Sequence, residues 1–545
     1  MNFEADIVII GSGSAGCVLA ERLSQQQDTH VLVVESGERG RTPTIAIPAG
    51  FVYHFNSPRY NYCYQSEPEP ELHHQRVYQP RGKGVGGSGA INAMIYVRGE
   101  PQDFDDWAAC SSERWSYTSV LPYFRRLERH HSANTRLHGR TGPIGVASTR
   151  DSAPDLCHAF FEACSTSGLA FNADFNGESL DGYGFYDMNV RGGRRSSSAR
   201  EYLAPALKRS NLRLMTRTQV TRLVFEGKRA IGVEVQQGEH RRVITARREV
   251  ILCAGAVDSP KLLMLSGIGD ANALAQLGID SVVDNPHVGQ NLQDHLCGSL
   301  FFKSREPTLN MTLRSLKGKL QAGWHYMSRR QGPLAFGVKH AGAFVPLTLA
   351  DHEHPPTTSS AKAQVFFNPI SYALPESSGG KLVLHDHAEV SLFYNVCRPH
   401  SRGTITLRSA NPCDPPLIHN RYLTDPRDKV ELFAAFRRVR ELATAGPLAE
   451  ILIDHRGYAD LEGDDDILDD FAASCGSIYH LCGSCAMGTS ASNSVVDPEL
   501  RVHETQGLRV VDASIFPNIT SGNTQAPTLM VAEVAADIIR QSWDT

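Results

Sequence analysis

Residues 6–35 read DIVIIGSGSAGCVLAERLSQQQDTHVLVVE, and this stretch decides how the chain begins to fold. Residues 6–10 and 30–34 are short apolar runs, which predict two strands buried on both faces. A glycine triplet of the form G-x-G-x-x-G follows the first strand, and residues 17–27 have apolar positions at helical spacing. Glu35 closes the second strand. This order of elements is the fingerprint of a dinucleotide-binding unit.

Each glycine of the loop has its own mechanical role. Gly11 permits the tight turn, Gly13 lets the backbone approach a pyrophosphate, and Gly16 lets the helix pack closely on the strand. Ser14 and Ala15 open the helix, where unpaired N–H groups and the positive end of the helix dipole favour phosphate groups. These positions predict where a dinucleotide binds.

The acidic residue after the second strand restricts the choice of dinucleotide. Glu35 lies 19 residues after Gly16 and is expected to accept hydrogen bonds from ribose hydroxyls. A carboxylate at this place disfavours NADP, whose ribose carries a phosphate. FAD and NAD both remain open from this segment alone.

The composition is that of an ordinary globular protein. The chain has 545 residues, of which 41% are hydrophobic and 21% charged, and this excludes an intrinsically disordered protein. Its length corresponds to about three domains' worth of chain. The formal net charge of -5 and the absence of a basic stripe disfavour nucleic acid as a partner. No apolar run is long enough for a membrane span.

The start of the chain and its cysteines predict a cytoplasmic protein. The apolar run at residues 7–10 is short, follows acidic residues and ends in glycine, unlike a secretory signal. Twelve cysteines at irregular spacings are expected to be reduced thiols. Cys482 and Cys485 form a C-x-x-C pair, but two further zinc ligands at matching spacing are not evident, so no metal site is predicted.

Five further blocks extend the pattern along the chain. They are RGKGVGGSGAINAMIYVRG (81–99), GAVDSPKLLMLSGIG (255–269), HLCGSCAMG (480–488), VVDASIFP (510–517) and SGNTQAPTLMVAEVAADII (521–539). Together with the first segment they resemble the glucose-methanol-choline family of FAD-dependent oxidoreductases, especially its choline-dehydrogenase-like and primary alcohol dehydrogenase members. The resemblance covers nearly the whole chain and implies FAD as the cofactor.

The resemblance implies a catalytic pair near the end of the chain. His480 heads a His-x-x-Gly-x-x-x-Met-Gly block, where family members carry their catalytic histidine, and Asn523 matches a second active-site position. Alcohol oxidation needs removal of the hydroxyl proton and transfer of hydride to flavin N5. A neutral histidine suits the proton transfer, whereas asparagine cannot act as a base. The proton is therefore expected to go to His480.

The resemblance also implies further cofactor-binding positions. Ile91 stands where some relatives carry a histidine that links FAD covalently, so a non-covalent flavin is expected. Asp512 ends a predicted strand at 508–511, before a predicted helix at 526–539, and capping of the next turn is an alternative role for it. The implied positions are Gly87, Ser88, Asn92, Ala93, Val220, Asp512, Ala513, Asn523, Thr524 and Gln525.

The predicted fold class is α/β, with a Rossmann-type FAD-binding domain and a discontinuous α+β substrate domain. We assign residues 1–150, 205–300 and 470–545 to the FAD-binding domain, and residues 151–204 and 301–469 to the substrate domain. Turn signals separate four apolar or alternating runs, which predict an antiparallel sheet beside an amphipathic helix at 428–444. The four runs are residues 363–367, 381–384, 389–394 and 403–407.

The resulting expectation is oxidation of a primary alcohol to the aldehyde, with electrons passed to a quinone or similar acceptor. An oxidase using O₂ and a choline dehydrogenase are alternatives within the class. A non-oxidative flavoprotein, such as a hydroxynitrile lyase or a fatty acid photodecarboxylase, is an alternative from another class. Peripheral contact with the inner face of a membrane is also expected, and the oligomeric state stays open. His130 and His131 are predicted to form a solvated pair, and His295 to be structural.

Overall fold

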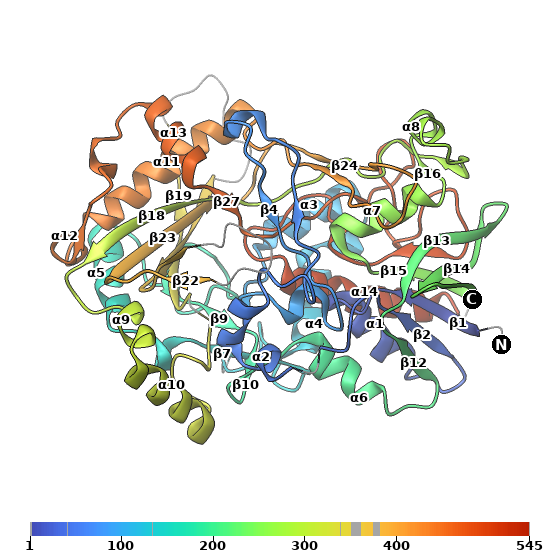
Figure 1. Ribbon diagram of the computed structural model, residues 1–545, viewed down its shortest axis with the longest axis horizontal. Coiled ribbons are helices and arrows are strands. Elements are labelled where there is room, and N and C mark those ends of the chain that lie inside the picture. Colours follow the sequence, from blue (N-terminus) through green and yellow to red (C-terminus); the bar gives the residue numbers. More distant parts are fainter. Residues whose placement is uncertain are drawn as a thin grey trace.

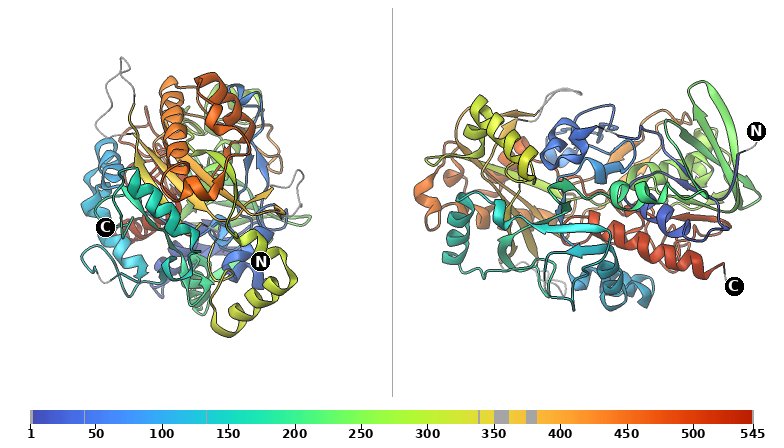
Figure 2. Two further views of the ribbon diagram at one scale, coloured as in Figure 1. Left: turned by 90° about the vertical axis from the view of Figure 1, so that its left-hand side faces the viewer. Right: turned by 90° about the horizontal axis from the view of Figure 1, so that it is seen from below.

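The computed structural model describes residues 3–40, 42–132, 134–337, 339–349, 361–373 and 382–543. The molecule is elongated, with one large sheet towards each end (Figure 1). Both ends of the chain lie at the end of the molecule that holds the first sheet, in Figure 1 and in the right panel of Figure 2. The fold is mixed α/β, as the sequence predicts.

The first sheet is built around β1 (Phe3–Ile10), whose residues 5–10 are buried between the neighbouring elements. The strand order is β12 (Leu212–Met215), β2 (Val31–Val34), β1, β15 (His240–Leu252), β14 (Arg229–Gln237) and β13 (Gln219–Glu226), and β28 (Leu508–Val510) also pairs with β15. Strands β12, β2, β1, β15 and β28 pair in parallel, whereas β13 and β14 pair antiparallel. This is the Rossmann-type sheet that the first segment predicts.

Two helices pack against each other beside this sheet, and each begins near the carboxyl ends of its parallel strands. Helix α1 (Ser14–Leu23) follows β1, and α14 (Gln525–Gln541) follows the segment after β28. The carboxyl ends of parallel strands are where such sheets bind ligands. Helix α1 ends at Leu23 rather than at residue 27, because polar residues follow it and supply no apolar face.

The second sheet is antiparallel throughout. Its order is β26 (Leu452–Ile453), β18 (Leu296–Ser304), β23 (Glu389–Val396), β20 (Lys362–Asn368), β19 (Ala341–Pro346) and β8 (Gly182–Phe185), and β27 (Gly476–Ser477) also pairs with β18. Strand β18 crosses residue 300, the position of a predicted boundary between the FAD-binding domain and the substrate domain.

The two faces of this sheet have different neighbours because side chains alternate along a strand. Leu392 and its equivalents on neighbouring strands join the core formed with α11 (Pro426–Ala443). Phe301, Phe366 and Phe393 point to the other face and line a cavity. The helix predicted at 428–444 is confirmed as α11. The opposite face of the sheet forms an aromatic wall of the cavity.

The prediction that the four apolar or alternating runs form one sheet is only half right. Two of the four runs are β20 and β23, but β22 (Val383–Leu384) pairs with β21 (Tyr372–Ala373), and β24 (Thr404–Thr406) pairs with β25 (Leu417–His419). Residue 381, which the prediction includes, lies outside the described residues. Alternation identifies a strand but does not name its partner.

Among the described residues, no helix combines the length and the apolar character that a membrane crossing requires.

Candidate active site

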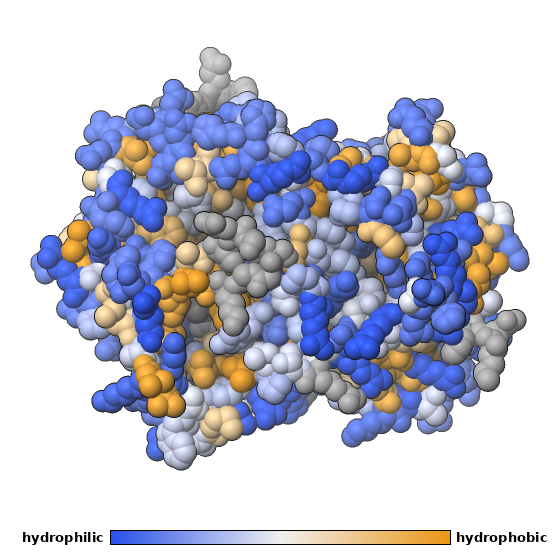
Figure 3. All heavy atoms as spheres, in the orientation of Figure 1, coloured by the Kyte–Doolittle hydropathy of each residue, from blue (hydrophilic) through white to orange (hydrophobic). Residues whose placement is uncertain are grey.

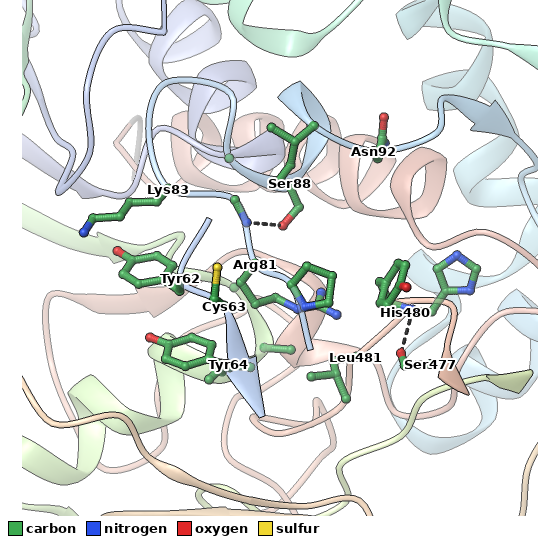
Figure 4. Close-up of a pocket in the computed structure, with 18 of the residues that line it drawn as sticks. Tyr62, Cys63, Tyr64, Arg81, Lys83, Ser88, Asn92, Ser477, His480 and Leu481 are labelled. Atoms are coloured by element: carbon green, nitrogen blue, oxygen red, sulfur yellow. Dashed lines mark hydrogen bonds between the residues drawn. The ribbon is translucent and has the colours of Figure 1, made fainter. Parts of the chain in front are cut away.

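A cavity of about 1070 Å³ runs between the two sheets and brings distant segments of the chain together. Figure 4 shows His480 towards one end, with Arg81 beside it and Tyr62 and Tyr64 beyond. Nearly all the positions expected from the sequence line this one cavity. They are Gly11, Gly13, Ser14, Ala15, Glu35, Gly87, Ser88, Asn92, Ala93, Val220, His480, Asp512, Ala513, Asn523, Thr524 and Gln525.

Gly16 does not line the cavity, and its contacts explain why glycine is needed there. A Cβ atom on Gly16 would lie 2.0 Å from the carbonyl oxygen of Gly11. Gly11 itself has φ of +97°, in the left-handed region that favours glycine. The two residues let α1 start directly against the end of β1, so that the first turn of the helix faces the cavity.

The Glu35 carboxylate is hydrogen-bonded to both glycine-rich loops at the end of the cavity next to β1 and β2. Its carboxylate accepts hydrogen bonds from the backbone N–H groups of Ser12 (2.9 Å), Gly37 (2.8 Å) and Gly84 (3.0 Å). The carboxylate therefore holds both glycine-rich loops next to the end of β2, on the wall of the cavity.

The second glycine-rich loop touches the first. A Cβ atom on Gly87 would lie 2.8 Å from Cα of Gly13, so the two backbones are in contact. Ser88 Oγ accepts a hydrogen bond from the backbone N–H of Gly82 (3.0 Å). Asn92 Oδ1 accepts one from the buried Arg195 guanidinium (2.6 Å), which fixes the Asn92 side chain at the cavity wall.

Asp512 caps a turn and also lines the cavity. Its carboxylate caps the turn after β28 by accepting a hydrogen bond from the Ser514 N–H (2.8 Å). It also accepts hydrogen bonds from the Gly255 N–H (2.8 Å) and the Ser259 hydroxyl (2.6 Å) while lining the cavity. A capping role and a place in the cavity are thus not exclusive.

His480 lies at the opposite end of the cavity within a chain of buried hydrogen bonds. Its Nδ1 is 2.8 Å from Nδ1 of His295, and its Nε2 is 3.0 Å from Nδ2 of Asn523. The backbone N–H of His480 donates to Asp294 Oδ1 (2.7 Å). His295 Nε2 is 2.8 Å from the carbonyl oxygen of Cys397.

These contacts fix the positions of the protons on both imidazoles. A carbonyl oxygen can only accept, so His295 Nε2 carries its proton and His295 Nδ1 is the acceptor. His480 Nδ1 must then donate to His295, which leaves the lone pair of His480 on Nε2. That lone pair accepts a hydrogen bond from Asn523. The arrangement presents a basic nitrogen beside an amide.

Both imidazoles are held neutral. Burial lowers the pKa of His480 well below its usual range, and His295, Arg81 and Lys339 lower it further. Burial also lowers the pKa of His295. A neutral His480 can accept a proton at physiological pH, which is what a general base requires.

The roles of two residues at this end of the cavity, His295 and Lys339, are not apparent from the sequence. His295 is more than the structural residue expected, because its side chain orients His480. Lys339 lines the cavity with an ammonium group 3.9 Å from the ring centre of Phe366 and 4.9 Å from that of Phe393. Burial lowers the pKa of Lys339 to about 8. All three contacts join segments far apart in the chain, so no local pattern announces them.

Arg81 is a further, half-buried cation on the cavity wall. Its Nε and Nη2 atoms have no hydrogen-bond partner among the described residues. Unpaired guanidinium donors of this kind fit an electron-rich or anionic ligand. Because two helix N-termini and Glu35 line the same cavity as Arg81, the residues present fit a flavin dinucleotide.

Several other cysteines and histidines are notable in the sequence, and the structure shows the surroundings of each. Cys482 and Cys485 are buried free thiols. His73 and His74 are exposed, but the expectation of a solvated pair at His130 and His131 is wrong for His130, which is buried in a short strand. Local polarity suggests a loop there, yet both imidazoles bond the buried carboxylate of Asp187.

Comparison with known proteins assigns the family. The model described as GMC oxidoreductase matches residues 5–297, and its C-terminal counterpart matches residues 399–532. The chain belongs to the GMC oxidoreductase family. As a member of this family it is an FAD-dependent oxidoreductase that acts on CH–OH donors, as the sequence blocks imply.

Similar proteins span the whole chain. It is 40% identical over 542 residues to an oxygen-dependent choline dehydrogenase of Brucella ovis, covering 98% of this chain and 95% of the relative. A protein of the same name from Sinorhizobium medicae is 40% identical over 548 residues, with the same coverage. Pyridoxine 4-oxidase from Mesorbium loti has a TM-score of 0.85 and 30% identity, with 99% of each chain covered. A variant formate oxidase of Aspergillus oryzae RIB40, at 24% identity, has a TM-score of 0.90 over 99% of each chain and shares the fold.

Proposed function

We propose that the chain oxidises a neutral primary alcohol to the aldehyde, with His480 as the base and Asn523 as the residue that holds the substrate oxygen. The observation that carries this proposal is the lone pair on His480 Nε2, fixed by His295 and directed to Asn523 inside the cavity. FAD supplies the hydride acceptor at flavin N5 when it is bound.

The chain's own residues account for the proton. A substrate hydroxyl that replaces the amide of Asn523 at His480 Nε2 can donate its proton there. Asn523 Nδ2 then donates to the substrate oxygen and stabilises the negative charge that develops on it. His295 holds the other nitrogen of His480, so that the ring keeps its orientation when it becomes charged.

The same cavity supports the proposed cofactor residues. The N-termini of α1 and α14 suit the pyrophosphate and the flavin ring, respectively, and Glu35 suits a ribose. Ile91 has no nucleophilic side chain, so we propose a non-covalent flavin. The proposed binding positions are those expected from the sequence, with Gly16 acting only through packing.

Lys339 supports a neutral substrate rather than choline. The trimethylammonium group of choline would need the faces of aromatic rings or a carboxylate. The rings of Phe366 and Phe393 already have a cation over them, the ammonium of Lys339. Choline would therefore have to displace or repel a like charge, although the 40% identical relatives are named choline dehydrogenases.

A matched pair of alcohols tests the substrate class. 3,3-Dimethylbutan-1-ol has the shape of choline with carbon in place of nitrogen, so the two differ in charge alone. We expect anaerobic bleaching of the flavin by the neutral alcohol to be more efficient by about tenfold or more. Hexanol and benzyl alcohol should also bleach the flavin. Equal or better reduction by choline would contradict the neutral-substrate proposal.

The charge of Lys339 provides the control for that comparison. Because its pKa is about 8, raising the pH past that value should weaken the discrimination against choline. Lys339→Met should weaken it at every pH. Product formed from any of these alcohols with an unchanged flavin spectrum would instead favour a non-oxidative reaction.

For the electron acceptor we propose a quinone or similar carrier, with O₂ as the alternative. The names of the relatives favour O₂, since they include an oxygen-dependent enzyme and an oxidase. Stopped-flow mixing of the reduced enzyme with air separates the two. Reoxidation within seconds indicates an oxidase, and far slower reoxidation that a soluble quinone accelerates indicates a dehydrogenase.

A further inference from the structure

Helices α9 (Leu309–Arg314) and α10 (Leu316–Arg329) form a hairpin at the edge of the molecule. The pair protrudes at the lower left of Figure 1 and at the lower right of the left panel of Figure 2. Large apolar side chains cover its outer surface, seen as orange spheres at the lower left of Figure 3. The exposed fractions are 49% for Met311, 75% for Leu316, 67% for Leu320, 71% for Trp324 and 69% for Met327.

Four of these residues form a stripe on α10, and the stripe points away from the protein. Leu316, Leu320, Trp324 and Met327 lie on one face because they are three or four residues apart. The face that packs against the protein consists of small residues and one tyrosine: Gly318, Ala322 and Tyr326. Residues two positions apart are separated by about 200° around a helix. The apolar stripe is therefore opposite the packed face and has no role in the core.

The hairpin is also basic within an acidic protein. No Asp or Glu occurs between Glu306 and Asp351, although the whole chain has a net charge of -5. The two helices and the residue after them carry Arg314, Lys317, Lys319, Arg329 and Arg330. Among the described residues, no salt bridge joins any of these five side chains to a carboxylate. Arg314 donates a hydrogen bond to the Leu384 carbonyl, and the Arg330 guanidinium lies 4.8 Å from the ring centre of Tyr326. The charges of the exposed Lys317 and Lys319 are thus available to an external partner.

We propose that the stripe of α10 docks on the surface of an anionic phospholipid bilayer. Leucine and methionine side chains enter the acyl boundary, Trp324 lies at the level of the headgroups, and the exposed Lys317 and Lys319, which flank the stripe, face lipid phosphates. A second copy of the chain fits less well, because two such faces would bring the lysines of both copies together without acidic partners. At 14 residues, α10 lies on a bilayer and is too short to cross it.

The hairpin is hydrogen-bonded to the wall of the catalytic cavity. Asn310 Nδ2 donates to the carbonyl of Ser371 (2.8 Å), and Arg314 Nη1 donates to the carbonyl of Leu384 (3.1 Å). Tyr372 and His385, beside these carbonyls, line the cavity. Docking would therefore place this wall near the membrane, where an apolar alcohol or a quinone dissolves. Only this last consequence rests on the proposed function, since lipid binding needs no turnover.

Vesicle flotation of the full-length, flavin-loaded protein tests the docking. We expect at least about tenfold more binding to vesicles of phosphatidylglycerol and phosphatidylcholine than to vesicles of phosphatidylcholine alone. Raising the salt from about 0.1 M to about 1 M shortens the Debye length from about 10 Å to about 3 Å and should weaken the binding. Brominated lipids should quench Trp324 fluorescence. Absence of binding to the anionic vesicles would overturn the proposal.

A set of matched variants shows whether the stripe is responsible. The double substitution Leu320→Glu and Trp324→Glu should abolish vesicle binding, whereas Val243→Glu, on an exposed residue of β15 at the other end of the molecule, should not. Equal binding by the double variant, or a dimer that it dissociates without any vesicle binding, would overturn the proposal. Flavin reduction by a soluble alcohol without vesicles should be unchanged in both variants. That measurement verifies folding and tests the proposed reaction separately from the docking.

Discussion

Two clusters of imidazoles in the described part of the chain differ in their partners. His480 and His295 contact each other, an amide and a carbonyl oxygen, none of which carries a negative charge. His130, His131 and His138 are stacked, with ring centres 3.8 Å apart for His130 and His138, and they bond carboxylates. His480 of the first cluster lines the cavity, whereas the second cluster supports the fold around β6 (Glu128–His130).

The carboxylates decide the charge of each cluster. Hydrogen bonding to Asp187 raises the pKa of His131, and bonds to Asp174 and Glu128 raise that of His138 although burial opposes them. Burial without such partners lowers the pKa of His480 and His295. A buried histidine without a carboxylate partner therefore stays neutral and can act as a base. A histidine that is hydrogen-bonded to a carboxylate is instead stabilised in its charged form.

Removal of the proposed base should give the largest effect. His480→Ala should retain FAD and the fold but reduce the flavin more than about a hundredfold more slowly with a primary alcohol, as expected for a lost general base. Anaerobic stopped-flow absorbance measures this rate. His131→Ala in the other cluster is the matched control and should leave the rate unchanged. Near-normal reduction by His480→Ala would refute the assignment.

Removal of the orienting imidazole should have a smaller effect. In His295→Ala the Nδ1 proton of His480 has no acceptor, so the ring is free to adopt the other tautomer, and we expect about a tenfold slower reduction. Binding of the alcohol should change little. His295→Gln supplies both a carbonyl for His480 and an amide N–H for Cys397, and should restore most of the rate. Equal losses in both variants would indicate a merely structural role.

The sequence predicts the end of the cavity that holds the glycine loop and Glu35 better than the end that holds His480. The glycine loop, its strands and Glu35 form a local pattern whose spacing fixes their geometry, and these elements are confirmed. The contact of His295 with His480 joins residues 185 positions apart, and Lys339 reaches Phe366 and Phe393 only because three strands pair. The spacing of Leu320 and Trp324 would equally suit a core face, since only the fold shows which side of α10 packs.

The pH dependence of flavin reduction sharpens the comparison further. Because the pKa of His480 lies well below its usual value of about 6.5, the imidazole should stay neutral as the pH falls from about 8 to about 6. The rate should therefore be nearly constant across this range and decline only at lower pH. Half-loss of the rate near pH 6.5, in wild-type protein that remains folded, would show that the base titrates like an ordinary exposed histidine.

The smallest expected effect is on stability and belongs to the second cluster. Asp187 accepts from His130 Nε2 (3.0 Å) and His131 Nε2 (2.7 Å), whose bonds lower the pKa of Asp187 despite its burial. Asp187→Asn would set an N–H against one of these donors, so we expect a loss of about 1–3 kcal/mol in the free energy of unfolding, measured by urea denaturation. Flavin reduction should not change.

The sign of the pH dependence identifies the ion pair as the cause. The raised pKa of His131 gives stability that is present below its unfolded value of about 6.5 and is lost as the pH rises through the folded value. The lowered pKa of Asp187 gives stability that is present above about 3.9 and is lost as the pH falls. The difference between wild type and Asp187→Asn should therefore be largest between about pH 4 and about pH 6.5. A difference independent of pH would mean that packing alone, rather than charge, separates the second cluster from the first.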